Sequence, residues 1–324
     1  MHPLLRSRRT HLRAIFGTTV VASILSLAAG CDKRTADTVK EPAQTSLANK
    51  PKALFFLFGD KSDPRVLPLA TLVDGKIKPI ELDAAGWRNF DQLYFAPGAR
   101  LPLLQAGASV GDAVVRRGMW DGKDALYKLP ACHALRPLAA VTLSGNPTQA
   151  VMLELLATSD ALPTSPVRPA PTKADSDSAA AFAFRGGQHE GLTNSARAEL
   201  DEVLAELPTG ATSHPTLVGS YMERGSGVNG KPRHVFIIGD YSDSTKSYVQ
   251  SFVHVPGDSV REFRRLIDHA DLTGDGVDEI VLEGWRNGGD SFLVFMQYKL
   301  GHWREIARGA TSWCADGPRK LSER

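Results

Sequence analysis

The chain has 324 residues, of which 42% are hydrophobic and 23% are charged, enough to fill the core of one large domain or two ordinary ones. Its formal net charge is +2, but residues 1–30 hold four arginines and no acidic residue. Subtracting these four from the 38 lysines and arginines leaves 34 basic against 36 acidic residues. This balance argues against nucleic-acid binding, which needs a basic face to displace counterions.

Residues 1–31 have the pattern of an export signal. Four arginines precede an uncharged stretch, 14–31, and small residues come just before Cys31. A basic region, an apolar region and small residues at the cleavage site make a secretory signal. The alternative is an uncleaved transmembrane helix, for which 18 residues that include glycine and two threonines are marginal. We therefore expect residues 1–30 to be a signal peptide.

The end of this segment, from Leu27 to Cys31, resembles the bacterial lipobox. The leucine lies four residues before the cysteine, and Ala28 fills its usual place. The resemblance implies cleavage before Cys31 and diacylglycerol on its sulfur, so the partner of the mature N-terminus would be the lipid bilayer. Asp32 favours the periplasmic face of the inner membrane, and the outer membrane is the alternative location.

The export route is also left open. Residues 7–13 resemble a twin-arginine signal, with His11 where an aromatic residue is usual. An ordinary basic region of a general secretory signal is the favoured alternative.

The mature chain divides by composition into a tether, two β-rich blocks and a segment between them. Residues 31–51 lack aromatic residues and predict a flexible tether. Residues 52–157 predict a β-rich block, in which Asp74-Gly75 marks a hairpin turn and 151–156 is either helix or strand. Residues 158–190, which hold four prolines, predict a linker or a long exposed loop.

Residues 191–324 predict one helix followed by a second β-rich block. Ala196, Leu200, Val203, Leu204 and Leu207 share one helical face, which predicts an amphipathic helix over 193–207. The expected strands are 216–222, 234–239, 247–255, 279–284, 291–298 and 303–307. The fold class is therefore mainly β with a minor α component, as a β-meander or propeller-like blades.

Two short segments, 56–63 and 236–243, match at five of eight positions. Duplicated blades would give such an echo. Chance similarity between two strand-to-turn segments explains it equally well, because Gly and Asp recur in turns for local steric reasons.

The clearest metal-binding pattern lies at 271–280, where side-chain oxygens fall at relative positions one, three, five and nine. Position six is Gly276, which suits a sharp turn around an ion, and position seven is Val277, which offers its carbonyl. Position twelve is Leu282 instead of the glutamate of an EF-hand, and a strand rather than a helix follows. The pattern predicts a Ca²⁺ loop outside the EF-hand class.

This segment resembles the calcium loop of FG-GAP or VCBS repeats, which occur in β-propellers and bacterial surface proteins. The resemblance covers about 25 residues, with Thr273 in place of the usual asparagine. It implies that Asp271, Thr273, Asp275 and Glu279 bind Ca²⁺ through side chains and Val277 through its carbonyl. The ion would have a structural role.

Cys132 and Cys314 are the two cysteines that remain after lipidation. In an oxidising compartment an even pair favours a disulfide, and two separate buried thiols are the alternative.

No residue pattern indicates a catalytic site, and the metalloprotease motif H-E-x-x-H is absent from the sequence. The sequence therefore favours an exported, lipid-anchored, noncatalytic binding or assembly protein of the bacterial envelope, with an envelope protein or a glycan as partner. An envelope hydrolase whose site is assembled from distant residues and a purely structural lipoprotein are the alternatives.

Overall fold

A computed structural model describes residues 50–80, 82, 84–119, 138–145, 152–166, 168–188, 192–225, 232–257, 261–286 and 291–310. These residues all belong to one unit of the chain, 48–324. The predictions for the signal peptide, the lipidated Cys31, most of the tether and the Cys132–Cys314 bridge lie outside the described residues.

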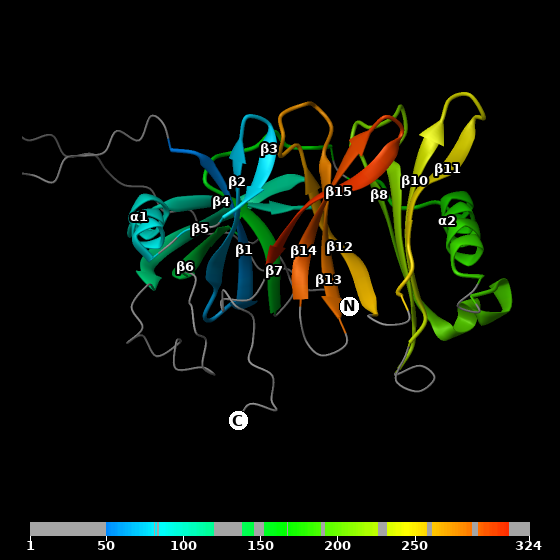
Figure 1. The fold of residues 1–324 in the computed structure, drawn as a ribbon, viewed down its shortest axis with the longest axis horizontal. Helices are drawn as coiled ribbons and strands as arrows, with labels where there is room; N and C mark the ends of the chain where they lie inside the picture. Colours follow the sequence, from blue (N-terminus) through cyan, green and yellow to red (C-terminus); the bar gives the residue numbers. More distant parts are fainter. Residues whose placement is uncertain are drawn as a thin grey trace, which may run out of the picture. The chain divides into compact units, whose positions relative to one another are not determined.

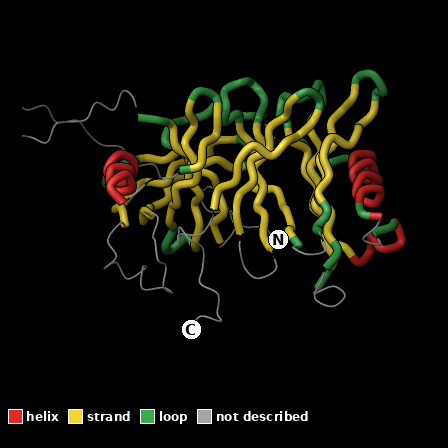
Figure 2. Tube along the Cα trace, in the orientation of Figure 1, coloured by secondary structure: helices red, strands yellow, loops and turns green. Residues whose placement is uncertain are grey.

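Strands make up most of the described chain, and the helices are short segments (Figure 2). The mainly β class with a minor α component is confirmed. In chain order the elements are β1 (Lys52–Asp60), β2 (Arg65–Val73), β3 (Lys76–Pro79), α1 (Ala84–Tyr94), β4 (Arg100–Gln105), β5 (Ala108–Met119), β6 (Leu138–Gly145), β7 (Met152–Thr158), α2 (Lys173–Gly186), the 3₁₀ helix η4 (Asn194–Glu199), β8 (Leu200–Leu207), β9 (Thr216–Glu223), β10 (His234–Ser242), β11 (Ser247–His254), β12 (Glu262–Ala270), β13 (Glu279–Arg286), β14 (Ser291–Lys299) and β15 (His302–Ala310).

The first seven strands form one antiparallel sheet in the order β1-β7-β4-β5-β6-β2-β3. An additional pairing of β1 with β2 closes six of these strands into a barrel-like ring, with β3 attached outside it. The β2–β3 hairpin turns at Asp74-Gly75, where both residues have positive φ (51° and 64°), as the sequence predicted. The open choice for 151–156 is decided in favour of strand β7.

The apolar run at 53–58 has no alternating polar residues, because both faces of strand β1 are buried. Phe55 and Leu57 point into the barrel, whereas Leu54 and Phe56 belong to a second cluster outside it. Helix α1 adds Trp87, Phe90 and Tyr94 to the interior cluster. The barrel is therefore filled by side chains rather than hollow.

The other eight strands form two four-stranded antiparallel meanders, ordered β11-β10-β9-β8 and β12-β13-β14-β15. Figure 1 shows each as a run of neighbouring strands. These sheets have the form expected of blades. The expected strands 216–222, 234–239, 247–255, 279–284, 291–298 and 303–307 are all present, and β12 is an additional strand that the sequence analysis missed.

The β12–β15 sheet is buried on both faces. One face packs on the outside of the barrel through residues such as Val281, Leu293 and Phe295. The opposite face packs on the β8–β11 sheet through residues such as Leu282 and Val294. The β8–β11 sheet in turn carries α2 on its far side. The β12–β15 sheet is thus the layer that joins the barrel to the rest of the fold.

The predicted helix over 193–207 is wrong. Only 194–199 is helical, as a 3₁₀ turn, and 200–207 is strand β8, paired along its length with β9. Leu200 and Leu204 lie four residues apart, so they share a face in a strand as well as in a helix. Val203, expected on the apolar face, is 63% exposed, because the pairing with β9 decides which residues face inward.

The predicted linker or long loop over 158–190 is wrong for its second half, which is helix α2. The helix begins directly after the proline-rich stretch, with a capping box between Thr172 and Asp175. Its Phe182 and Ala183 are buried against β9 and β10. The prolines suggested a loop, but an alanine-rich helix follows them.

A buried carboxylate joins the two meanders. Asp240 of β10 accepts hydrogen bonds from Thr216 Oγ1 (2.7 Å), from Ser251 and from the indole Nε1 of Trp303 on β15 (2.8 Å). The matching residue of the sequence echo, Asp60, is exposed and only caps its own turn. The two segments therefore share a strand-to-turn pattern without sharing a structural role.

We predict that Trp303→Phe destabilises the fold by about 1–3 kcal/mol, because the buried Asp240 carboxylate loses a donor. Chemical denaturation measures this loss. Trp285→Phe is the matched control, since the Trp285 ring also packs beside another aromatic ring, that of Phe263, but donates to no carboxylate among the described residues. Equal losses in the two variants would contradict an energetic role for the indole hydrogen bond.

Candidate functional site

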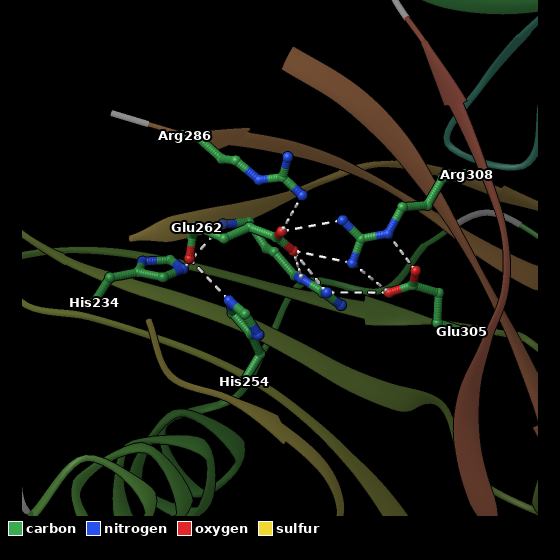
Figure 3. Close-up of polar contacts among 7 residues, drawn as sticks. His234, His254, Glu262, Arg286, Glu305 and Arg308 are labelled. Carbon is green, nitrogen blue, oxygen red and sulfur yellow. Dashed lines mark hydrogen bonds and ion pairs between the residues drawn. The ribbon is translucent and has the colours of Figure 1, made fainter. Parts of the chain in front are cut away.

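The largest charged cluster of the described chain lies at one end of the two meanders. Antiparallel pairing brings the start of β12 beside the end of β13, so that Glu262 faces Arg286 in register. Arg264, two residues along β12, is only 5% exposed. Glu305 and Arg308 reach the same place from β15 (Figure 3).

Glu262 is the centre of this cluster. Its Oε1 accepts from Arg264 Nη2 (2.8 Å) and Nε (3.1 Å) and from Arg308 Nη2 (3.3 Å). Its Oε2 accepts from Arg308 Nη1 (3.0 Å) and Arg286 Nη2 (3.3 Å). Burial raises the pKa of Glu262, but the hydrogen bonds and charges of Arg308 and Arg264 outweigh it and lower the pKa to about 2. The carboxylate is therefore ionised and is a poor proton acceptor at neutral pH.

A second carboxylate and an aromatic ring hold the arginines in place. Glu305 accepts from Arg264 Nη2 (3.1 Å), from Arg308 Nη2 (3.0 Å) and from Arg308 Nε. The guanidinium carbons of Arg286 and Arg308 lie 4.9 Å and 4.7 Å from the centre of the Phe292 ring. Hydrogen bonds to Glu305 raise the pKa of Arg308, so its positive charge is permanent.

Two histidines border the cluster and are kept neutral. His234 is fully buried and accepts from the backbone N–H of Arg264 through Nε2 (3.1 Å). Burial lowers its pKa to about 3, helped by the charges of Arg264 and Arg261. His254 donates from Nε2 to the carbonyl oxygen of Glu262 (2.8 Å), and burial followed by the charge of Arg264 lowers its pKa. Neither imidazole is poised for proton transfer at neutral pH.

The arrangement suits ionic binding better than acid–base or nucleophilic chemistry. Its acid is ionised down to low pH and its histidines are neutral, so no pair of groups has pKa values near the physiological range. The cluster offers a set of fixed guanidinium N–H donors. Two of its arginine side chains, Arg286 and Arg308, are 39% and 37% exposed.

The predicted calcium loop forms the turn between β12 and β13. Gly274 and Gly276 have positive φ of 76° and 85°, which only glycine adopts without strain. Asp271 accepts from the backbone N–H groups of Gly274 (2.7 Å), Asp275 (3.1 Å) and Gly276 (3.1 Å). The sharp turn at Gly276 and the strand after the loop agree with the sequence analysis.

The carboxylates of this loop do not meet in a metal cage. Asp275 accepts from the Val277 N–H (3.0 Å). Glu279 is 1% exposed and accepts from Leu272 N (2.9 Å), from Thr273 N (3.1 Å) and Oγ1 (2.9 Å), and from Gln297 Nε2 (3.0 Å). No group of three or more His, Cys, Asp or Glu residues in the described chain is placed to hold a metal ion.

The loop thus has the backbone shape for an ion, while hydrogen bonds from the protein occupy the oxygens of Asp271 and Glu279. Each carboxylate oxygen has two lone pairs and can accept an N–H group while it binds an ion, so the Ca²⁺ site stays a prediction. Burial raises the pKa of Glu279 to about 7, against the lowering effect of its four donors.

A serine, a histidine and an aspartate do come together beside this loop, but not as a catalytic triad. Ser165 Oγ and His269 Nδ1 (2.6 Å) both donate to the same oxygen of Asp278. The serine is thus bonded to the acid rather than to the imidazole, and His269 is fully buried beneath Gly107. With Asp268, which accepts from Gly107 N and from Arg168, the group fastens β12 to the barrel and to the 159–172 segment.

The structure also shows two surface hollows without an evident catalytic set. One, of about 580 Å³, lies along α2 between residues that include Phe184, Arg185 and Arg197. The other, of about 390 Å³, lies at one end of the barrel beside Arg116 and Thr142.

Sequence reasoning found the loop and missed the arginine–glutamate cluster. The cluster takes one or two residues from each of several strands, and β12 itself was not predicted. Arg264 and Arg286 are visible in the sequence as charged residues, but their common location depends on strand pairing.

Comparisons of the chain with models of protein families, with curated proteins and with solved structures give no match. Among the described residues no helix is both long and apolar enough to cross a membrane.

We predict that protonation of Glu262 between about pH 4.5 and pH 2 lowers the free energy of unfolding of the chain. Because the pKa of about 2 in the folded chain lies below the ordinary value of 4.5, the ionised carboxylate stabilises the fold above pH 4.5, and this contribution is lost as pH falls. Glu262→Gln should show a flatter acid limb. At neutral pH it should be roughly 3 kcal/mol less stable, because Arg264 loses its main counter-charge.

Denaturation curves at several pH values test this prediction. Glu199→Gln is the control, because Glu199 is 64% exposed in its ion pair with Arg233 and such pairs contribute about 0–1 kcal/mol. An acid limb in Glu262→Gln as steep as in the native chain would contradict the role assigned to Glu262.

Proposed function

We propose that the chain is an exported, lipid-anchored, noncatalytic binding or assembly protein of the bacterial cell envelope. Its anchor is the acylated Cys31, and Asp32 favours the periplasmic face of the inner membrane over the outer membrane. Its partner is an envelope protein or a glycan. The proposal on location depends on the export pattern of residues 1–31 and on their resemblance to a lipobox.

One observation supports the noncatalytic role. In the described chain these buried acids and histidines are held in hydrogen bonds within the protein. Arginines keep Glu262 ionised, and Asp278 accepts from both His269 and Ser165. A general acid or base needs a pKa near the working pH and access to a substrate. The Ser165–His269–Asp278 group is the nearest to a hydrolase site, and its buried geometry does not favour that alternative.

The binding role is supported by the partly exposed end of the meanders. Arg286 and Arg308 present guanidinium edges there, and the nearby Ile306 is 39% exposed. Charged donors beside apolar surface are typical of interface rims. We therefore place the partner-binding face at this end of the β12–β15 sheet.

Photo-crosslinking of the native chain in intact cells tests the proposal. A photoreactive residue at position 306 is expected to give a discrete adduct, and one at Leu300 (90% exposed, at the β14–β15 turn) is the control that should not. Cys31→Ser is expected to release the protein from the membrane fraction and to weaken the adduct. Absence of an adduct at position 306, or cleavage of an envelope polymer by the purified protein, would overturn the proposal.

A structural Ca²⁺ ion in the 271–279 loop remains part of the proposal on the strength of the sequence pattern alone. Its ligands would be Asp271, Thr273, Asp275 and Glu279 with the Val277 carbonyl. The alternative supported by the hydrogen bonds is a loop closed without metal, in which Gln297 and Thr273 satisfy Glu279.

Melting curves with calcium and with EGTA distinguish the two. If the ion binds, the melting temperature should rise by several degrees with saturating calcium, and Asp275→Ala should abolish the rise. Magnesium at the same concentration is the control, because it demands a tighter octahedron. A calcium-independent melting temperature would remove the ion and leave the hydrogen-bonded loop.

A further inference from the structure

The cluster around Glu262 has more donors than acceptors. Three guanidinium groups, those of Arg264, Arg286 and Arg308, face two carboxylates, those of Glu262 and Glu305, which leaves a net charge of +1. Glu262 already accepts five hydrogen bonds and Glu305 three. A carboxylate has about four lone-pair sites, so little acceptor capacity is left for further N–H groups.

Two N–H groups of this cluster are buried without a partner among the described residues. They are Nη1 of Arg264, whose side chain is 5% exposed, and Nε of Arg286. Both guanidiniums bind the same Glu262 carboxylate through other nitrogens, at 2.8 Å and 3.3 Å. A buried N–H group without an acceptor destabilises the fold, which calls for an acceptor at this place.

Arg286 is placed to offer a donor to a ligand from solvent. Its side chain is 39% exposed, and its guanidinium is fixed between the Phe292 ring and Glu262. A guanidinium held in this way loses little freedom when it binds an oxygen pair through its planar fork.

We propose that an oxyanion of the phosphate or carboxylate class binds against Arg286 at this end of the β12–β15 sheet, with Arg264 as the buried charge behind it. The proposal rests on the binding role proposed above and names the chemistry of the group that the partner presents. A cation would meet a net positive cluster, and a neutral group would leave the charge uncompensated.

The electrostatic surroundings agree with an anion. The charge of Arg264 lowers the pKa of both His234 and His254, which indicates a positive potential around the cluster. An anion beside Arg286 would reduce this potential, so the imidazole resonances of His254 should move when the ligand binds.

The experiment is a titration of the full-length protein at constant ionic strength, followed by NMR of the arginine Nε–H groups and of His254. The probes are inorganic phosphate, acetate and a soluble short-chain phosphatidylglycerol, with chloride as the ionic-strength control. A saturable shift of the Arg286 Nε–H with at least one probe, and none for Arg224, is expected. Arg224, which directly follows β9, is 62% exposed and is paired with Asp201.

The matched variants are Arg286→Gln and Arg224→Gln. Loss of a charge-assisted hydrogen bond should weaken oxyanion affinity about tenfold or more in Arg286→Gln and leave it unchanged in Arg224→Gln. Arg286→Lys, which keeps the charge but loses the fork, should fall between them. The probe that binds most tightly identifies the source as free phosphate, a lipid headgroup or a carboxylate.

Two outcomes would overturn the oxyanion site: shifts that follow chloride as closely as phosphate, which would mean a non-selective response to any anion, or equal affinity in the native chain and in Arg286→Gln. If the variant fails to fold, the resonances of the native protein decide the question. A persistent adduct at position 306 would show that the binding role stands while the oxyanion proposal falls.

Discussion

The fold depends on burial of both faces of the β12–β15 sheet. Phe295 and Leu293 face the barrel, whereas Val294 and Met296 face the other meander, so alternate residues of one strand belong to two different cores. Full burial of each large apolar side chain contributes roughly 1.5–3 kcal/mol. Because this sheet touches both neighbours, a substitution on β14 that alters its register would disturb the barrel interface and the meander interface together.

Polar groups fasten these layers where the apolar packing ends. Asp240 joins β10 to Trp303 of β15, and Asp268 joins β12 to Gly107 at the β4–β5 turn of the barrel. Both carboxylates are buried and accept hydrogen bonds from other segments of the chain, in addition to the His269 N–H that donates to Asp268. Such contacts fix the relative placement of the sheets, since a displaced sheet would leave a buried carboxylate without its donors.

The two ends of the β12–β15 sheet differ in chemistry. At the β12–β13 turn, Asp271 and Glu279 accept from backbone and amide donors, and the loop is closed on itself. At the opposite end Glu262 is surrounded by guanidinium groups with spare donors and partial exposure. A closed hydrogen-bonded end serves stability, whereas a charged end with unsatisfied donors is suited to a ligand, and this contrast guides the functional proposal.

The sequence by itself determined the β-rich class, most strands of the second block, the Asp74-Gly75 hairpin and the turn at Gly276, because these features depend on alternation and on local φ preferences. Tertiary structure decided what local pattern leaves ambiguous. Leu200 and Leu204 fit a helix or a strand equally, and pairing with β9 chose the strand. The barrel closure and the cluster around Glu262 bring together residues from distant strands, and such long-range pairing has no local signature in the chain.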